Sequence, residues 1–184
     1  MFYEMEIAGL KRKLQLFPVS DELRIAAFIL FGDVEITEAA AKELLSVAPQ
    51  FDIILTAEAK SIPLAYEMSK QAGKNNYIIA RKGIKVYMKD VISTEVDSIT
   101  TQHTQTLYLG KREVDSIKGR RVLIVDDVIS TGASLESMEQ LVEKAGGKIA
   151  GKMAILAEGD AMYREDIIAL KQLPLFNADG TVKK

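Results

Sequence analysis

Residues 122–134 read Val-Leu-Ile-Val-Asp-Asp-Val-Ile-Ser-Thr-Gly-Ala-Ser, and this stretch decides the fold. An apolar run ends in two adjacent carboxylates, Asp126 and Asp127, and a loop of small residues then leads into an amphipathic helix. The pattern predicts a buried strand with two acids at its carboxyl end, beside free N–H groups at a helix N-terminus. Such N–H groups bind phosphate, and paired carboxylates bind a vicinal diol or help to hold Mg²⁺. Together these features fit a ribose 5-phosphate.

The thirteen residues resemble the motif with which type I phosphoribosyltransferases bind 5-phosphoribosyl 1-diphosphate (PRPP). Enzymes of that family join a nitrogenous base to ribose 5-phosphate and release pyrophosphate. The resemblance implies that Asp126 and Asp127 are catalytic residues that bind the ribose hydroxyls, directly or as ligands of Mg²⁺. It also implies that the 5-phosphate is bound by the loop residues Ser130, Thr131, Gly132, Ala133 and Ser134.

Two other interpretations explain the motif less completely. An acidic pair after an apolar strand is also typical of receiver domains of response regulators, in which a phosphorylated Asp follows on a later strand. After the pair, Asp160 comes too soon, Asp166 lies in a stretch that looks helical, and Asp179 lies in a polar tail. An ordinary strand-to-helix turn with a Ser N-cap leaves the two adjacent acids unexplained. PRPP binding is therefore the stronger interpretation.

The composition restricts the class of protein. A chain of 184 residues that is 48% hydrophobic fits a single globular domain with a sizeable core. Its net charge of −2 gives no basic footprint, so we expect no nucleic-acid partner. Because cysteine is absent, disulfides and thiolate sites are excluded. We see no apolar run typical of a membrane span or signal peptide, and expect a cytoplasmic protein with no membrane partner.

Strand-like and helix-like segments alternate along most of the chain. This order predicts an α/β fold with a mainly parallel, doubly wound sheet, in which ligands bind beyond the carboxyl ends of the strands. Residues 1–36 stand outside the pattern and are expected to form a small N-terminal hood or lid over a core of residues 37–176. Residues 177–184 form a polar tail that is expected to fray. We predict helices over residues 37–48, 61–72 and after the motif, and strands over 51–56, 77–80, 104–109, 121–125 and 149–157.

A second strand-to-helix junction carries Glu58, Ala59, Lys60 and Ser61. Small residues with one cation at a helix start suit an anionic ligand, although a capped helix with a solvated Lys gives the same pattern. The segment resembles the pyrophosphate loop of purine phosphoribosyltransferases. Lys60 stands where the adenine enzymes often have Arg, and Ser61 where they have Gly. The resemblance also suggests a cis peptide near Ala59-Lys60.

Three cations, Arg81, Lys82 and Lys85, follow the next predicted strand. An isolated Arg-Lys pair is usually solvated, but in this position it resembles the Arg-Lys of adenine and xanthine phosphoribosyltransferases. The resemblance implies that these cations bind pyrophosphate, with Lys82 in a catalytic role. It also implies a mobile loop over residues 83–101 that closes over PRPP and excludes water. The single histidine, His103, is interpreted as structural or solvated.

Two positions bear on the choice of base. Ser130 stands where hypoxanthine-guanine enzymes commonly have an Asp, and Gly159 stands where xanthine enzymes have a Lys after the Glu. The resemblance therefore favours purine salvage with adenine and PRPP as substrates, AMP and pyrophosphate as products, Mg²⁺ as cofactor, and a homodimer. Xanthine or hypoxanthine-guanine as the base is one alternative. The other, a PRPP-sensing regulator with the same fold, is disfavoured by the acidic charge and the short N-terminal segment.

Overall fold

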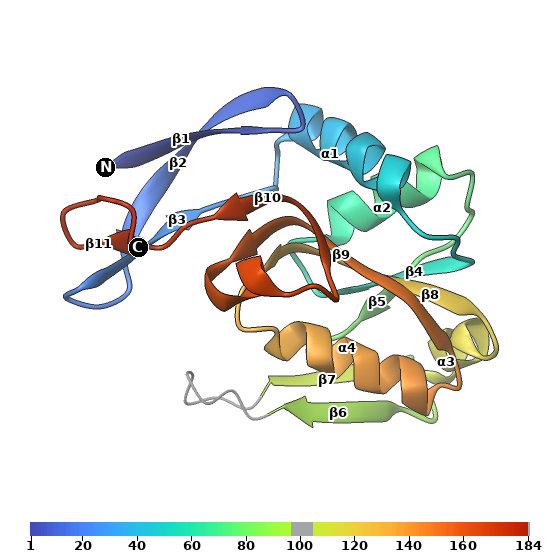
Figure 1. Cartoon of the computed structure of the whole chain (residues 1–184). Helices are drawn as coiled ribbons and strands as arrows, with labels where there is room; N and C mark the ends of the chain where they lie inside the picture. The colour runs from blue at the N-terminus through green and yellow to red at the C-terminus, as the bar shows by residue number, and fades with distance from the viewer. Residues whose placement is uncertain (97–104, 184) are drawn as a thin grey trace.

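The computed structural model describes residues 1–96 and 105–183. At its centre lies a sheet of five parallel strands in the order β10-β9-β8-β4-β5 (Figure 1). The strands are β4 (Ile53–Ala57), β5 (Ile78–Ala80), β8 (Arg121–Ile129), β9 (Lys148–Glu158) and β10 (Ile168–Leu173). The stretch around Asp166 that looks helical in the sequence instead contains the short 3-10 helix η1 (Gly159–Tyr163) and the start of β10.

Helices cover both faces of the sheet, which confirms the predicted doubly wound α/β fold (Figure 1). On one face lie α1 (Val34–Val47) and α2 (Ile62–Gln71), which pack against each other. On the other face lies α4 (Ala133–Lys144), whose outer side carries the hairpin of β6 (Ile92–Val96) and β7 (Gln105–Leu109). None of the helices in the described part of the chain is long and apolar enough to cross a membrane.

The apolar core has two halves, one on each face of the sheet. In β8, Leu123 and Val125 join the cluster under α1 and α2, whereas Val122 and Ile124 join the cluster under α4, and all four are fully buried. Successive side chains of a strand point to opposite faces. A parallel strand covered on both faces therefore reads as a continuous apolar run, and this is why the motif strand could be predicted.

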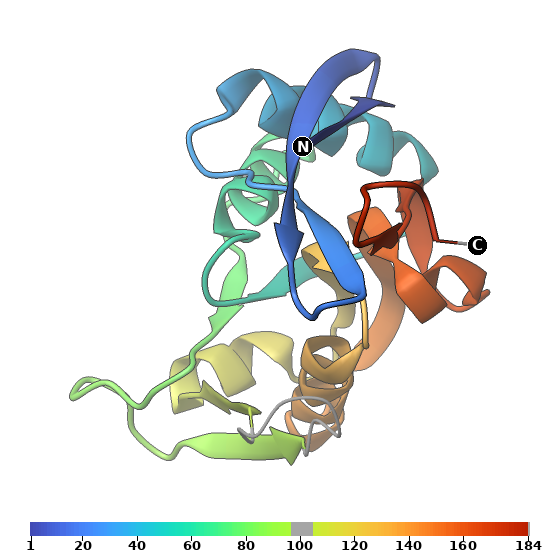
Figure 2. The ribbon, with the colours of Figure 1, turned by 90° about the vertical axis from the view of Figure 1, so that its left-hand side faces the viewer.

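The N-terminal hood is an antiparallel sheet in the order β1-β2-β3-β11 (Figure 2). It consists of β1 (Phe2–Ile7), β2 (Leu10–Pro18) and β3 (Leu23–Ala27), joined by β11 (Phe176–Asn177) from the far end of the chain. The tail that was expected to fray is folded, because the Asn177 N–H donates to the Thr181 carbonyl and Phe176 bridges to Val182. The division into hood, core and tail by residue number stays a prediction.

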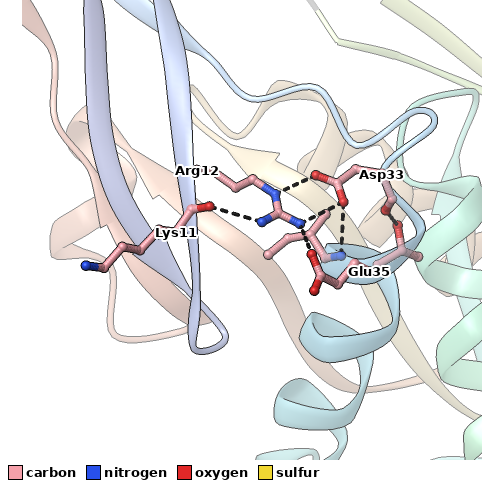
Figure 3. Close-up of polar contacts among 6 residues, drawn as sticks. Lys11, Arg12, Asp33 and Glu35 are labelled. Atoms are coloured by element: carbon pink, nitrogen blue, oxygen red, sulfur yellow. Dashed lines mark hydrogen bonds and ion pairs between the residues drawn. The ribbon is translucent and has the colours of Figure 1, made fainter.

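An arginine of the hood is bound to the start of α1 (Figure 3). Arg12 donates from Nε and Nη2 to the Asp33 carboxylate at 2.6 and 2.9 Å, and Nη2 also donates to Glu35 at 2.8 Å. Asp33 is the N-cap of α1, since its Oδ1 accepts from the Ile36 N–H. The helix therefore begins at Val34, three residues before the predicted start at residue 37. Thr37 lies within the first turn of the helix, where its hydroxyl donates to the Asp33 carbonyl.

Strand β6 and helix α3 depart from the predicted secondary structure. Strand β6 occupies part of the region expected to form a mobile loop, including Ser93 and Thr94, because the hairpin packs on α4 and the Thr94 hydroxyl is buried against the Ser137 carbonyl. Helix α3 (Lys111–Ile117) was not predicted. The remainder of the predicted loop, residues 97–101, and His103 lie outside the described residues.

The Arg12 cluster gives a test of how the hood is attached. We expect Asp33→Ala to lower the free energy of unfolding by about 1–2 kcal/mol, because it removes both the N-cap and the ion-pair partner of Arg12. Glu35→Ala removes only the exposed second partner and should leave stability nearly unchanged. Urea denaturation of both variants measures the difference. An equal decrease in the free energy of unfolding of the two variants would show that the N-cap at Asp33 adds no stability of its own.

Candidate active site

The acid pair lies inside β8 rather than just beyond its end. We predicted that the strand stops at Val125, but its pairing with β9 continues through Asp126 and Val128 to Ile129. The neighbouring strand supplies backbone partners that a hydrophobic pattern cannot reveal, because the carboxylates interrupt the apolar run. The acids nevertheless lie in the carboxyl half of the strand, toward the edge of the sheet where ligands of doubly wound folds bind.

A chain of hydrogen bonds joins the acid pair to the second strand-to-helix junction. The buried Thr56 hydroxyl at the end of β4 donates to Ser61 Oγ at 2.7 Å, and Ser61 Oγ donates to Asp126 Oδ1 at 3.0 Å. Asp126 Oδ1 also accepts from the Asp127 N–H at 2.9 Å. Because β4 and β8 are adjacent parallel strands, their carboxyl ends bring the two sequence segments together. The role of Thr56 was not predicted, although a lone threonine in a fully apolar strand is a usable signal.

The surroundings of the acid pair are unfavourable for two negative charges. Asp127 is 4% exposed, and its Oδ2 is a buried atom without a hydrogen-bond partner within the described part of the chain. Burial raises the pKa of Asp126 above its ordinary value, and the neighbouring charge of Asp127 raises it further. Burying a carboxylate oxygen without a partner costs free energy. Such an arrangement is typical of a functional site whose polar groups meet a ligand.

The predicted phosphate loop turns directly from β8 into α4. Gly132 is the N-cap of α4 and has φ of +84°, a left-handed conformation that favours glycine. Asp126 and all five loop residues border one small hollow of about 50 Å³. The structure therefore places Asp126 and the start of the helix around the same space, whereas Asp127 does not border this hollow.

The pyrophosphate segment and the following cations meet at Glu58. Its carboxylate accepts from the Lys82 backbone N–H at 3.0 Å, and its Oε1 lies 3.5 Å from Arg81 Nη2. A cis peptide occurs at Glu58-Ala59, one bond before the position that the resemblance suggested. Ala59, Lys60 and the Lys82 side chain are exposed.

Lys85 differs from the other predicted pyrophosphate ligands in its contacts. Its backbone N–H donates to the Met88 sulfur in the turn after β5. Within the described residues it makes no hydrogen bond or ion pair with Glu58, Arg81 or Lys82. The structure thus joins Glu58 to the Arg-Lys pair and Ser61 to Asp126, while the predicted binding roles themselves stay predictions.

Glu158 adds a further carboxylate where β9 ends. The side chain is half-buried, and burial raises its pKa, while the positive charge of Lys60 opposes that rise. Lys60 comes from the pyrophosphate segment after β4, so its charge acts on the end of β9, two strands away in the sheet. The next residue, Gly159, has φ of +58°, which an L side chain rarely adopts.

The acid pair suits Mg²⁺ only if the substrate completes the coordination shell. No group of three His, Cys, Asp or Glu side chains that could hold a metal occurs among the described residues. Mg²⁺ in phosphate-handling sites is commonly held by one or two carboxylates, with substrate oxygens and water as the other ligands. Asp126 and the unpartnered Oδ2 of Asp127 provide such a partial set.

Comparison with known proteins agrees with this geometry. The phosphoribosyl transferase domain family matches residues 33–175, which is most of the chain. The chain belongs to this family. It falls in the purine branch of the type I enzymes, as the motif predicted.

Curated relatives with different purine bases match about equally well. The hypoxanthine/guanine phosphoribosyltransferase of Methanococcus voltae is 30% identical over 145 residues, 79% of this chain and 71% of that protein. A xanthine enzyme of Exiguobacterium is 29% identical over 155 residues (82% and 79%). An adenine enzyme of Rhodococcus jostii is 30% identical over 128 residues (69% of each chain).

The fold is also found in solved structures. The adenine phosphoribosyltransferase of Thermoanaerobacter pseudethanolicus superimposes with a TM-score of 0.67 at 21% identity, over 94% of this chain and 96% of that one. This similarity supports the type I fold, including the hood.

The raised pKa of Asp126 predicts an unusual stability effect. A carboxyl with a raised folded-state pKa contributes stability below its unfolded pKa of about 3.9, and that contribution is lost as the pH rises through the folded value. At pH 7 Asp126→Asn should therefore raise the unfolding free energy of the free protein by on the order of 1 kcal/mol, or about 2–4 °C in Tm.

Asp52 provides the control of opposite sign. The Arg121 guanidinium beside it lowers the pKa of Asp52, so its ionised form favours the folded state. Asp52→Asn should lower Tm at pH 7, and this loss should become smaller only as the pH falls toward the unfolded-state pKa of about 3.9. Thermal melts of both variants between pH 4 and pH 8 measure the two effects. A Tm that falls in Asp126→Asn at pH 7 would contradict the account of the acid pair.

Proposed function

We propose that this phosphoribosyltransferase transfers ribose 5-phosphate from PRPP to adenine, giving AMP and pyrophosphate for purine salvage. The observation that carries the proposal is the hydrogen bond between Ser61 and Asp126. It joins the predicted pyrophosphate segment to the predicted ribose and phosphate motif, so that one site can hold both ends of PRPP.

Each part of PRPP has a candidate partner in this site. The loop from Ser130 to Ser134 would bind the 5-phosphate through backbone N–H groups and hydroxyls. Asp126 and Asp127 would accept hydrogen bonds from the two ribose hydroxyls, which supplies the partner that the buried Oδ2 of Asp127 lacks in the described part of the chain. Bound Mg²⁺ would neutralise charge on the pyrophosphate.

The reaction would be a displacement at the anomeric carbon with oxocarbenium character. Residues Glu58 to Ser61, with Arg81, Lys82 and Lys85, would hold the leaving pyrophosphate. The Glu58 carboxylate fixes the backbone at Lys82, which positions the two segments relative to each other. Catalysis would come mainly from orientation of the reactants and from stabilisation of charge on the leaving group. Lys82 is the candidate for the latter.

Two features support adenine as the base. Ser130 offers no carboxylate that could act near a 6-oxopurine, and Gly159 has no side chain that could donate a hydrogen bond to a 2-oxo group. The φ of +58° at Gly159 strengthens the second argument, because a lysine there would strain the backbone. Xanthine and hypoxanthine-guanine remain the alternatives, since relatives with those names are equally similar.

The proposal includes a cytoplasmic homodimer. Val34 and Tyr66 border an apolar groove of about 450 Å³ between α1 and α2, and both side chains are more than half exposed. Exposed apolar groups gathered around a groove are typical of protein interfaces. Sedimentation equilibrium would measure the mass directly.

The base assignment predicts a clear ranking of substrates. With PRPP and Mg²⁺ in excess, adenine should be converted faster than xanthine, guanine or hypoxanthine at equal concentration. A site that hydrogen-bonds one base edge rejects the wrong edge by a factor of about 10⁴. Release of pyrophosphate with each base in turn gives the ranking. Faster turnover of xanthine or guanine would refute adenine while leaving the family assignment intact.

The ribose role of the acid pair predicts the effect of Asp127→Asn. The change keeps the shape of the side chain but removes its charge, so kcat/KM for PRPP should fall by about tenfold or more. Adenine affinity in the absence of PRPP should not change. Asp115→Asn, on the exposed side of α3, is the control and should have wild-type activity. Wild-type kinetics in Asp127→Asn would contradict the ribose-binding role and would favour the interpretation of the motif as an ordinary capped turn.

A further inference from the structure

The phosphate motif contains no cation of its own. Between Arg121 and Lys144 the sequence has no lysine or arginine, but it has five acids: Asp126, Asp127, Glu136, Glu139 and Glu143. One of them, Glu136, lies in the first turn of α4, where its negative charge opposes an anion at the helix N-terminus. A bound 5-phosphate would therefore meet local repulsion unless another part of the fold supplies positive charge.

Arg164 brings a cation to this loop from a different element. It follows η1, more than thirty residues after Gly132 in the sequence. A β-carbon built on Gly132 would lie 2.7 Å from Arg164 Nη1 and 4.0 Å from its Cζ. The guanidinium therefore lies against the backbone of the predicted phosphate loop. It also gives Gly132 a second reason to be glycine, besides its left-handed φ.

A paired carboxylate sets the orientation of this guanidinium. Arg164 donates from Nε to Asp166 Oδ1 at 2.8 Å and from Nη2 to Asp166 Oδ2 at 2.7 Å. This bidentate pairing leaves Nη1 on the side that faces Gly132. Lys152 of β9 bridges Asp166 and Glu139 of α4, so the pair is fixed to the sheet and to the motif helix. A preorganised guanidinium loses little entropy when it binds an oxyanion.

We propose that Arg164 is a further binding residue for the 5-phosphate of PRPP and of the nucleotide product, positioned by Asp166. The inference rests on the proposed function, because it concerns the same site. Arg164 lies outside the thirteen-residue motif and was not among the predicted site residues. Its charge would offset that of Glu136 and Glu139, with which it already interacts, and would favour phosphate over an uncharged 5-hydroxymethyl group.

The test separates the 5-phosphate from the rest of PRPP. Affinities for ribose 5-phosphate and for inorganic pyrophosphate, both with Mg²⁺, are measured by calorimetry on the full chain. Arg164→Met should weaken binding of ribose 5-phosphate by about tenfold or more while pyrophosphate affinity stays within about twofold. The affinity of the wild type for ribose 5-phosphate should also fall more steeply with salt than that of the variant.

Arg121→Met is the matched control. Arg121 makes a comparable bidentate pair with Asp52, but it lies where β8 begins, at the opposite end of the strand. This variant should bind both ligands as the wild type does. Arg164→Lys keeps the positive charge but lacks the forked geometry of the guanidinium. Its affinity for ribose 5-phosphate should lie between that of the wild type and that of Arg164→Met. If Arg164→Met does not fold, Arg164→Gln should give the same split between the two ligands.

Two results would overturn the inference. The first is wild-type affinity of Arg164→Met for ribose 5-phosphate. The second is an equal loss of ribose 5-phosphate and pyrophosphate binding, which would indicate that Arg164 only maintains the structure of the site. If the wild type itself bound neither ligand, the proposed function would fail together with the inference. That outcome differs from one in which the wild type binds both ligands and Arg164→Met binds ribose 5-phosphate equally well, which would overturn the inference alone.

Discussion

The hydrogen bond from Ser61 Oγ to Asp126 Oδ1 is the contact on which the arrangement of the site depends. It joins two strand-to-helix junctions that lie far apart in the sequence. The junctions can meet because β4 and β8 are neighbouring parallel strands, with Leu55 opposite Ile124. The Thr56 hydroxyl donates a hydrogen bond to Ser61 Oγ and so orients the Ser61 hydroxyl. A pyrophosphate segment and a ribose motif are thereby held in one relative position before any ligand arrives, and such preorganisation lowers the cost of binding.

This arrangement has an energetic cost within the protein. Two adjacent carboxylates sit in a strand whose other side chains after Arg121 are apolar, and one carboxylate oxygen is buried without a partner in the described residues. The two halves of the apolar core, one on each face of the sheet, offset that cost. Functional sites commonly reduce stability in this way, because the groups that bind a ligand are not satisfied without it.

The sequence predicted the parts of the structure whose pattern is local. The continuous apolar run of β8, the amphipathic face of α4 and the glycines around them follow from strand and helix periodicities, and their order gives the doubly wound sheet. Contacts made across the sequence could not be predicted in the same way. The cap at Asp33 depends on Arg12 in the hood, and the extension of β8 past Asp126 depends on β9. Arg164 follows η1, far from Gly132 in the sequence, and only the folded chain brings its guanidinium to the motif loop. The contact between Ser61 and Asp126 is of the same kind, since each segment was recognised but not their direct bond.

A double-mutant cycle between Ser61 and Asp126 tests the central claim most directly. PRPP affinity, with Mg²⁺, is measured by calorimetry for the wild type, Ser61→Ala, Asp126→Asn and the double variant. If the two residues act through their shared hydrogen bond in one PRPP site, the double variant should lose less than the sum of the single losses, with a coupling energy above about 0.5 kcal/mol. Additive losses would show that the two segments bind independently, and no measurable PRPP binding by the wild type would refute the site as a whole.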